Sequence, residues 1–195
     1  MDILLIDNND SFTYNIVEML RQTIKNRFPD DSLNIIIRSV DEFAFAEAEE
    51  AWKLIISPGP GLPEDYPVLF NIMEQLASTK SILGICLGFQ LICRFFGAAL
   101  YNLPDVVHGQ PRNVKVMDKN ALLFRGEQNM KVGLYHSWAV RNESMPDTLN
   151  TTAVSDEGII MGVQHKTFDI HAVQFHPESY ITENGKALFE RFLMG

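Results

Sequence analysis

The length and charge of this chain exclude several classes of protein before any motif is considered. Its 195 residues, 46% of them hydrophobic, are enough for a sizeable core, and we expect one domain over residues 1–195. The formal net charge of −9 argues against a nucleic-acid-binding surface, and no apolar run reaches the roughly 20 residues that cross a bilayer.

The first hundred residues alternate between short apolar strands and amphipathic helices. We expect strands at 3–6, 33–38, 53–56 and 81–85, and helices at 12–25, 68–77 and 87–96. This alternation predicts a mostly parallel sheet with helices on both faces. Ligands of such sheets bind beyond the carboxyl ends of the strands, where the loops after Ile6, Ile56 and Ile85 fall.

Beyond about residue 105 the pattern changes to short strands separated by turns. We expect strands at 113–117, 131–135, 139–141, 158–165 and 169–175, and a final helix at 184–193. Neither a repeat nor a linker separates the two halves of the chain, so these strands extend the same sheet in an antiparallel or mixed fashion. The expected fold class is α/β, with an open, mostly parallel mixed sheet flanked by helices.

A cysteine lies between two glycines at a predicted junction of strand and helix, in the segment GICLG at residues 84–88. A sharp strand-to-helix turn needs small residues two positions before and after its tip, as in the nucleophile elbow of G-x-S-x-G hydrolases. The start of the following helix favours negative charge on sulfur. This context favours Cys86 as a nucleophile over a buried, inert thiol, which is the expectation for Cys93.

The two cysteines also indicate the compartment. Cys86 and Cys93 lie on one predicted helix, which does not offer the geometry of a disulfide. The N-terminus MDILLIDNNDS lacks the basic start of a secretion signal. We therefore expect free thiols and a cytoplasmic protein. The negative net charge favours small metabolites or a protein as partners.

Among the five histidines, His176 is the strongest candidate for the base that a thiol nucleophile needs. It ends an apolar strand and precedes Pro177, which favours an extended backbone. Glu178, two residues on, can lie on the same side as the imidazole and hold its tautomer. Taken alone, His-Pro-Glu fits an ordinary strand end equally well.

Attack on a carbonyl also requires two N–H donors for the resulting oxyanion. The amide of Leu87, directly after the cysteine, is the expected first donor. The loop SPGPG at residues 57–61 can supply the second, and because its prolines have no amide hydrogen, the donor is Gly59 or Gly61. A plain rigid turn explains the same alternation of proline and glycine.

The motifs SPGPG, GICLGFQ and QFHPES, in this order, resemble those of the class I (triad) glutamine amidotransferases. LLIDNNDSFTYN near the N-terminus and YHSW at 135–138 resemble the small glutaminase subunits of anthranilate synthase and aminodeoxychorismate synthase. The resemblance spans essentially the whole chain and implies the three-layer, flavodoxin-like fold of that family. It also implies hydrolysis of L-glutamine to glutamate and ammonia through a cysteinyl thioester. The ammonia would pass to a chorismate-using partner subunit, with no cofactor or metal in this chain.

The resemblance further implies a role for individual residues. Cys86 would be the nucleophile, His176 the general base and then acid, and Glu178 the group that orients His176. Gly59 is favoured over Gly61 as the second oxyanion donor. The positions implied to bind glutamine are Gly59, Pro60, Gly61, Leu87, Gln90, Ser137 and Trp138. Two positions depart from the common pattern, since many relatives have histidine in place of Phe89 and a smaller aliphatic residue in place of Trp138.

Two other functions stay open from sequence alone. A γ-glutamyl peptidase or hydrolase on the same scaffold would use the same triad. A regulatory subunit without catalysis would keep the fold, although the intact candidate triad weighs against it. Whether the product is anthranilate or aminodeoxychorismate depends on the partner, so this chain does not decide it.

Overall fold

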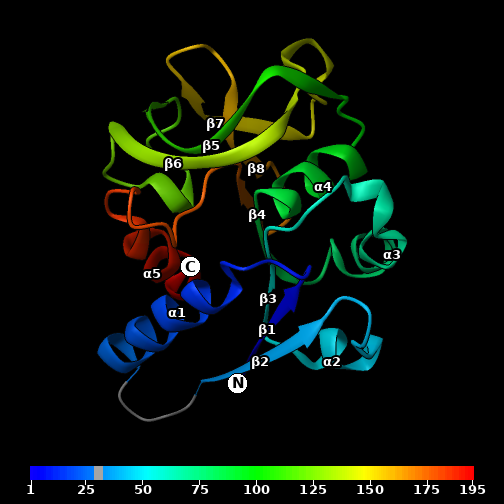
Figure 1. Ribbon diagram of the computed structural model, residues 1–195. Helices are drawn as coiled ribbons and strands as arrows, with labels where there is room; N and C mark the ends of the chain where they lie inside the picture. Colours follow the sequence, from blue (N-terminus) through cyan, green and yellow to red (C-terminus); the bar gives the residue numbers. More distant parts are fainter. Residues whose placement is uncertain (29–32) are drawn as a thin grey trace.

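One nine-stranded sheet forms the centre of the molecule in a computed structural model that describes residues 1–28 and 33–195 (Figure 1). The strand order is β2-β1-β3-β4-β9-β8-β7-β5-β6. The strands are β1 (Asp2–Asp7), β2 (Asn34–Ser39), β3 (Lys53–Ile56), β4 (Ser81–Ile85), β5 (Leu100–Val116), β6 (Asn129–Val140), β7 (Leu149–Ser155), β8 (Ile160–His165) and β9 (Ile170–Val173). The first five in this order pair in parallel and the remaining pairs are antiparallel. The expected mixed sheet is therefore confirmed.

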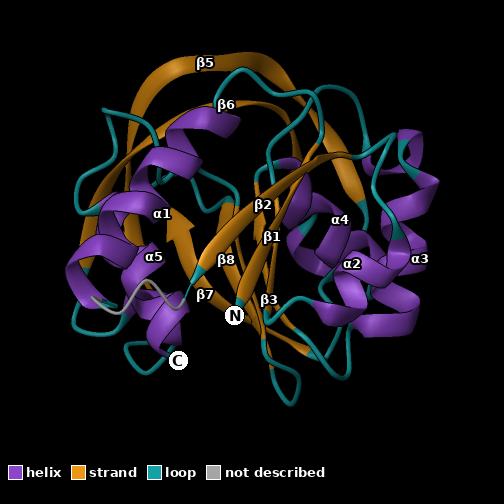
Figure 2. Ribbon diagram, turned by 90° about the horizontal axis from the view of Figure 1, so that it is seen from below, coloured by secondary structure: helices purple, strands orange, loops and turns teal. Residues whose placement is uncertain are grey.

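Helices cover both faces of the parallel part of the sheet, which makes three layers. They are α1 (Thr13–Arg27), α2 (Phe45–Glu50), α3 (Pro67–Leu76), α4 (Leu87–Phe95) and α5 (Gly185–Met194). Figure 2 shows α1 and α5 on one side and α2, α3 and α4 on the other. Among the described residues, no helix is long and apolar enough to span a bilayer.

Alternate residues of the central strands supply two separate cores. Ile3 and Leu5 of β1 pack into the core beneath α1 and α5, whereas Leu4 and Ile6 pack into the core beneath α2, α3 and α4. All four side chains are fully buried. Because successive strand residues point to opposite faces, a strand covered on both faces must be apolar throughout, which explains the continuous run Ile-Leu-Leu-Ile.

The second half of the chain departs from the expected boundaries. β5 and β6 are single long strands that arch together across the top of the molecule in Figure 1, so the short strand at 113–117 and the division of 131–141 into two strands were wrong. Pro104 and Gly109 of β5 fall where its pairing with β6 shifts register, between Asn102 and Val107 and between His108 and Gln110, as β-bulges allow. The strand β7 and the six-residue helix α2 were not predicted.

Candidate active site

Cys86 occupies a tight turn between β4 and α4. Its backbone dihedral angles, φ 52° and ψ −96°, lie in a region that residues other than glycine rarely adopt. Its amide donates to the carbonyl of Val173 on β9 at 2.9 Å, and its own carbonyl accepts from the amide of Gln90 at 3.0 Å. These bonds hold the strained turn between the sheet and the first turn of α4.

The two glycines around Cys86 are required by the close approach of helix and sheet. A Cβ atom on Gly84 would lie 2.5 Å from the carbonyl oxygen of Gly88, and a Cβ atom on Gly88 would collide with the carbonyl oxygen of Ile56 on β3. Real Cβ contacts are not that short, so any larger residue would push α4 off the sheet. The structure therefore bears out the packing reason for the GICLG pattern.

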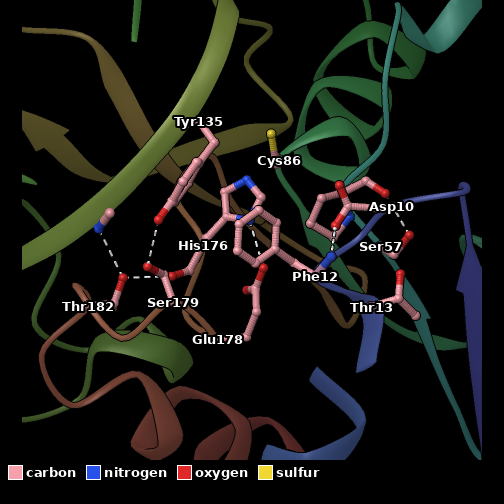
Figure 3. Close-up of polar contacts among 12 residues, drawn as sticks. Asp10, Phe12, Thr13, Ser57, Cys86, Tyr135, His176, Glu178, Ser179 and Thr182 are labelled. Carbon is pink, nitrogen blue, oxygen red and sulfur yellow. Dashed lines mark hydrogen bonds and ion pairs between the residues drawn. The ribbon is translucent and has the colours of Figure 1, made fainter. Parts of the chain in front are cut away.

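His176 and Glu178 form a buried pair immediately after β9. Nδ1 of His176 lies 2.6 Å from Oε1 of Glu178, and both residues are almost fully buried. The His176 amide donates to the carbonyl of Gly133 at 3.1 Å, and the hydroxyl of Thr182 donates to the His176 carbonyl at 2.6 Å. In Figure 3 the imidazole lies between Cys86 and Glu178. Among the described residues His176 Nε2 has no hydrogen-bond partner, so it is available to exchange a proton.

The electrostatic setting favours a protonated imidazole. Burial by itself lowers the pKa of His176, but attraction to Cys86 and the hydrogen bond and charge of Glu178 outweigh burial and hold this pKa well above its usual value. The charges of His176 and Glu178 also act on the carboxyl group of Asp10. Burial raises the pKa of Asp10, although the amide of Phe12 donates to its carboxylate at 2.7 Å and opposes this rise.

Two aromatic rings, which the sequence analysis did not single out, fix the His176 ring. The ring centroids of Phe12 and Tyr135 lie 5.4 and 4.9 Å from that of His176, both edge to face. The Tyr135 hydroxyl is 3.2 Å from the hydroxyl of Ser179, which holds the tyrosine in turn (Figure 3). The motifs NDSFTYN and YHSW contain both aromatics, so the available signal was their place in those motifs.

One side of Cys86 opens into a cavity of about 210 Å³. The cavity brings together six of the seven residues that the resemblance assigned to glutamine: Gly59, Pro60, Gly61, Gln90, Ser137 and Trp138. Tyr135 and His136 complete its wall. Leu87, the seventh, does not line the cavity with them.

Leu87 instead packs against Gly59, because a Cβ atom on Gly59 would lie 2.8 Å from the Leu87 side chain. The corresponding atom on Gly61 would collide with Asp65, away from the elbow. Among the described residues, neither the Gly59 amide nor the Leu87 amide donates a hydrogen bond to another protein group. Both N–H groups are therefore free to bind an oxyanion next to Cys86.

A second cavity, of about 450 Å³, reaches Cys86 from the side of the N-terminal loop. It shares Gly59, Pro60 and Tyr135 with the first cavity and adds residues of the loop after β1, together with His108 and His176. The sulfur is thus approached from two sides. A cavity of about 460 Å³ beside α1 and β2 contains none of the predicted site residues.

His136, on β6, is a second buried histidine in the wall of the smaller cavity. Its Nδ1–H donates to the carbonyl of Trp138 at 2.8 Å, which leaves Nε2 without a hydrogen. Burial lowers the pKa of His136 to about 4, so near neutral pH this ring is neutral whereas the His176 ring is charged.

Among the described residues, no three His, Cys, Asp or Glu side chains are grouped to hold a metal.

Comparison with known proteins places this chain in a family. Residues 4–195 match the family described as glutamine amidotransferase class-I. The chain is 45% identical over 193 residues to a Haemophilus influenzae protein provisionally named anthranilate synthase component II, covering 99% of this chain and 96% of that protein. It is 36% identical to aminodeoxychorismate synthase component 2 of Klebsiella aerogenes, covering 98% of each.

Solved structures share the fold. A Thermoplasma acidophilum protein provisionally named as one of the subunits of GMP synthase superposes with a TM-score of 0.84 at 26% identity, covering 100% of this chain and 92% of that one. A glutamine amidotransferase of Thermotoga maritima superposes with a TM-score of 0.73 at 19% identity, covering 91% and 76%. The family match over residues 4–195 and the relatives at 45% and 36% identity show that the chain belongs to the class I glutamine amidotransferases.

Proposed function

We propose that this chain is the glutaminase subunit of a chorismate-using synthase, and that it hydrolyses L-glutamine and delivers the ammonia to that partner. The convergence of Cys86, the His176–Glu178 pair and the smaller cavity carries the proposal. The names of its relatives, anthranilate synthase component II and aminodeoxychorismate synthase component 2, support the choice of partner. They do not favour a γ-glutamyl peptidase or a regulatory subunit without catalysis.

In the proposed first half-reaction, the Cys86 sulfur attacks the side-chain carboxamide carbon of glutamine and forms a C–S bond. The amides of Leu87 and Gly59 bind the oxyanion. The His176 imidazolium then gives its Nε2 proton to the departing nitrogen, the C–N bond breaks, and ammonia leaves. A thioester and a neutral imidazole remain, with Glu178 holding Nδ1–H throughout.

In the second half-reaction, neutral His176 takes a proton from water as the water oxygen attacks the thioester carbon. The second oxyanion occupies the same amides. Collapse of this intermediate breaks the C–S bond, releases glutamate, and restores the sulfur anion beside the imidazolium. The net change is glutamine and water to glutamate and ammonia, with no cofactor required.

The substrate is proposed to lie in the smaller cavity. Gln90 and the backbone of Ser137 and Trp138 supply polar groups for its amino-acid end, and Pro60 and Gly61 shape the wall beside Gly59. The register of β5 and β6 shifts between Asn102 and Val107, so the backbone at Ser137 is not opposed by a single β5 residue. Such an irregularity leaves strand backbone groups available to a ligand.

The decisive experiment replaces the nucleophile. Cys86→Ala in the assembled synthase should abolish product formation with glutamine while product formation with ammonium salts continues. Cys93→Ala, at the fully buried thiol on the helix α4 that follows Cys86, is the matched control and should keep glutamine-dependent synthesis. Hydrolysis of glutamine that survives Cys86→Ala would overturn the mechanism. Product identification with chorismate separates anthranilate from aminodeoxychorismate synthesis.

We also propose that the protein works in the cytoplasm. Its two cysteines are both free and buried, and a reducing compartment keeps thiols in that state. An active-site thiol that must remain reduced fits the same setting.

A further inference from the structure

A fully buried glutamine, Gln174, lies within hydrogen-bond distance of the sulfur of Cys86. It follows β9, and its backbone amide donates to the carbonyl of Met161 at 3.0 Å. Its side-chain Nε2 lies 3.6 Å from Cys86 Sγ, an ordinary distance for an N–H···S hydrogen bond given the large radius of sulfur. No step of the mechanism above uses this residue.

The direction of the bond follows from its neighbours. The carbonyl oxygen of Trp138 can only accept, so the group that Gln90 turns toward it at 3.1 Å must be its NH₂. The same NH₂ of Gln90 lies 3.2 Å from the side-chain oxygen of Gln174. With its oxygen engaged by Gln90, Gln174 must present its own NH₂ to the sulfur.

Because the Gln174 side chain is fully buried, its hydrogen-bond partners indicate what the sulfur must supply. Among the described residues, the Gln174 NH₂ group has only the Cys86 sulfur as a hydrogen-bond partner, and a buried amide without a good acceptor is costly. A neutral thiol is a weak acceptor, whereas a sulfur anion is a strong one. An apolar side chain would fill the space without that cost if the sulfur were never charged.

We infer that Gln174 is a hydrogen-bond donor to the nucleophilic sulfur of Cys86, stabilising its anionic form and coupling it to the glutamine cavity through Gln90. The inference rests on the proposed function, because it assigns a role at the same nucleophile. Gln90 lines the cavity and donates a hydrogen bond to the side chain of Gln174. A substrate that fixes the Gln90 side chain therefore also fixes the Gln174 NH₂ group beside the sulfur. Once the thioester forms, the sulfur loses its charge and the bond weakens.

The test compares two variants of the full chain. Gln174→Glu keeps the size and the oxygen that Gln90 binds but replaces the donor with a carboxylate oxygen. Gln174→Met keeps the length and removes both polar groups, and it decides the question if the glutamate variant does not fold. Alkylation by iodoacetamide, with mass spectrometry to locate the label on Cys86, reads the sulfur directly. We expect alkylation near neutral pH to slow roughly 3- to 10-fold, because loss of the anion outweighs the higher reactivity of each remaining anion.

Steady-state glutaminase kinetics supply a second measurement. We expect kcat to fall roughly 10-fold or more while KM for glutamine stays within about 3-fold. A general packing defect would lower both in proportion to the fraction of unfolded chain, which thermal unfolding measures. Gln164→Glu is the matched control, since this β8 glutamine also binds through its side-chain oxygen, to the amide of Leu122 at 3.1 Å. It should leave alkylation and kcat unchanged.

Wild-type alkylation rates in a folded Gln174 variant would overturn the inference, whatever happens to kcat. That outcome leaves the proposed function intact as long as Cys86→Ala abolishes glutamine hydrolysis. Retained hydrolysis in Cys86→Ala would instead defeat the proposed function. The two failures are therefore distinguishable.

Discussion

Nδ1 of His176 and Oε1 of Glu178 lie 2.6 Å apart, with both side chains removed from solvent. The carboxylate sits on the side of the imidazole opposite Cys86 (Figure 3). It fixes the ring so that Nε2 is the nitrogen left for chemistry, and it stabilises the positive charge that the sulfur also attracts. The positive charge on His176 therefore depends on groups from two separate segments of the chain.

Replacing this carboxylate tests its contribution. Glu178→Gln keeps an oxygen for Nδ1–H but removes the charge, so kcat should fall about 10²-fold or more with KM little changed. The pKa of His176 should fall as well, because Glu178 contributes to raising it. Since activity is lost as pH rises through that pKa, the alkaline limb of the kcat profile should move to lower pH. Glu183→Gln, at an exposed position in the same segment, is the control. An alkaline limb that does not move in Glu178→Gln would refute the role of Glu178 in raising the pKa of His176.

The buried His136 should make stability depend on pH. Its folded pKa of about 4 lies below the usual value of about 6.5, so between these values the unfolded chain binds a proton that the folded chain does not. Stability is therefore lost as pH falls through this window. From about pH 7.5 to about pH 5, wild type should lose about 2 kcal/mol more than His136→Gln, whose amide can still donate to Trp138. Urea unfolding at both pH values measures these losses of stability, with His108→Gln as a control at an exposed position. Equal losses in wild type and His136→Gln would contradict the prediction.

The elbow glycines should be intolerant of alanine. Gly88→Ala places a methyl group against the carbonyl of Ile56, so we expect about 3 kcal/mol of destabilisation or a displaced α4. Gly97→Ala separates this clash from backbone strain, because Gly97 has φ +105° but open space around it, and should cost about 1 kcal/mol. Denaturant unfolding of both variants provides the comparison. Equal costs would mean that the close approach of α4 is not what requires glycine.

Trp138 should matter through its backbone more than through its ring. Its carbonyl accepts from both Gln90 and His136, and these bonds survive a change of side chain. Trp138→Leu should therefore shift KM for glutamine by up to about threefold and leave kcat within about twofold. Steady-state glutaminase assays measure both constants. A tenfold loss of kcat would show that the indole ring itself positions the reacting groups.

The sequence predicted those features that depend on neighbours along the chain. The apolar runs at Ile3–Ile6 and 54–56 predict buried strands because a strand covered on both faces is apolar over most of its length. Lys53, at the start of β3, is the buried exception. The GICLG spacing predicts a tight turn because the clash that glycine avoids at position 84 is with Gly88, four residues on. The clash that glycine avoids at position 88 is with Ile56 of β3 and depends on the fold. His176 and Glu178 could be paired from sequence because they are only two residues apart. The structure brings them together in a turn, in which the Ser179 amide donates to the His176 carbonyl at 3.1 Å, and not in the expected extended segment.

Longer-range features could not be predicted in this way. Pro104 and Gly109 are local signals for turns, and pairing with β6 through shifted registers keeps β5 continuous across them. The neutral state of His136 depends on burial, which no local pattern encodes. Gln174 and Cys86 are 88 residues apart and meet only because β9 inserts beside β4.

The sequence by itself determined the central strands, the elbow, the candidate nucleophile with its histidine and carboxylate, and the family to which the chain belongs. Only the tertiary structure decided which residues line the cavity beside Cys86, which histidine is charged, and which way the Gln174 amide points. Strand propensity and glycine spacing are set by nearby residues, whereas electric field, burial and hydrogen-bond direction are set by groups that the fold brings together.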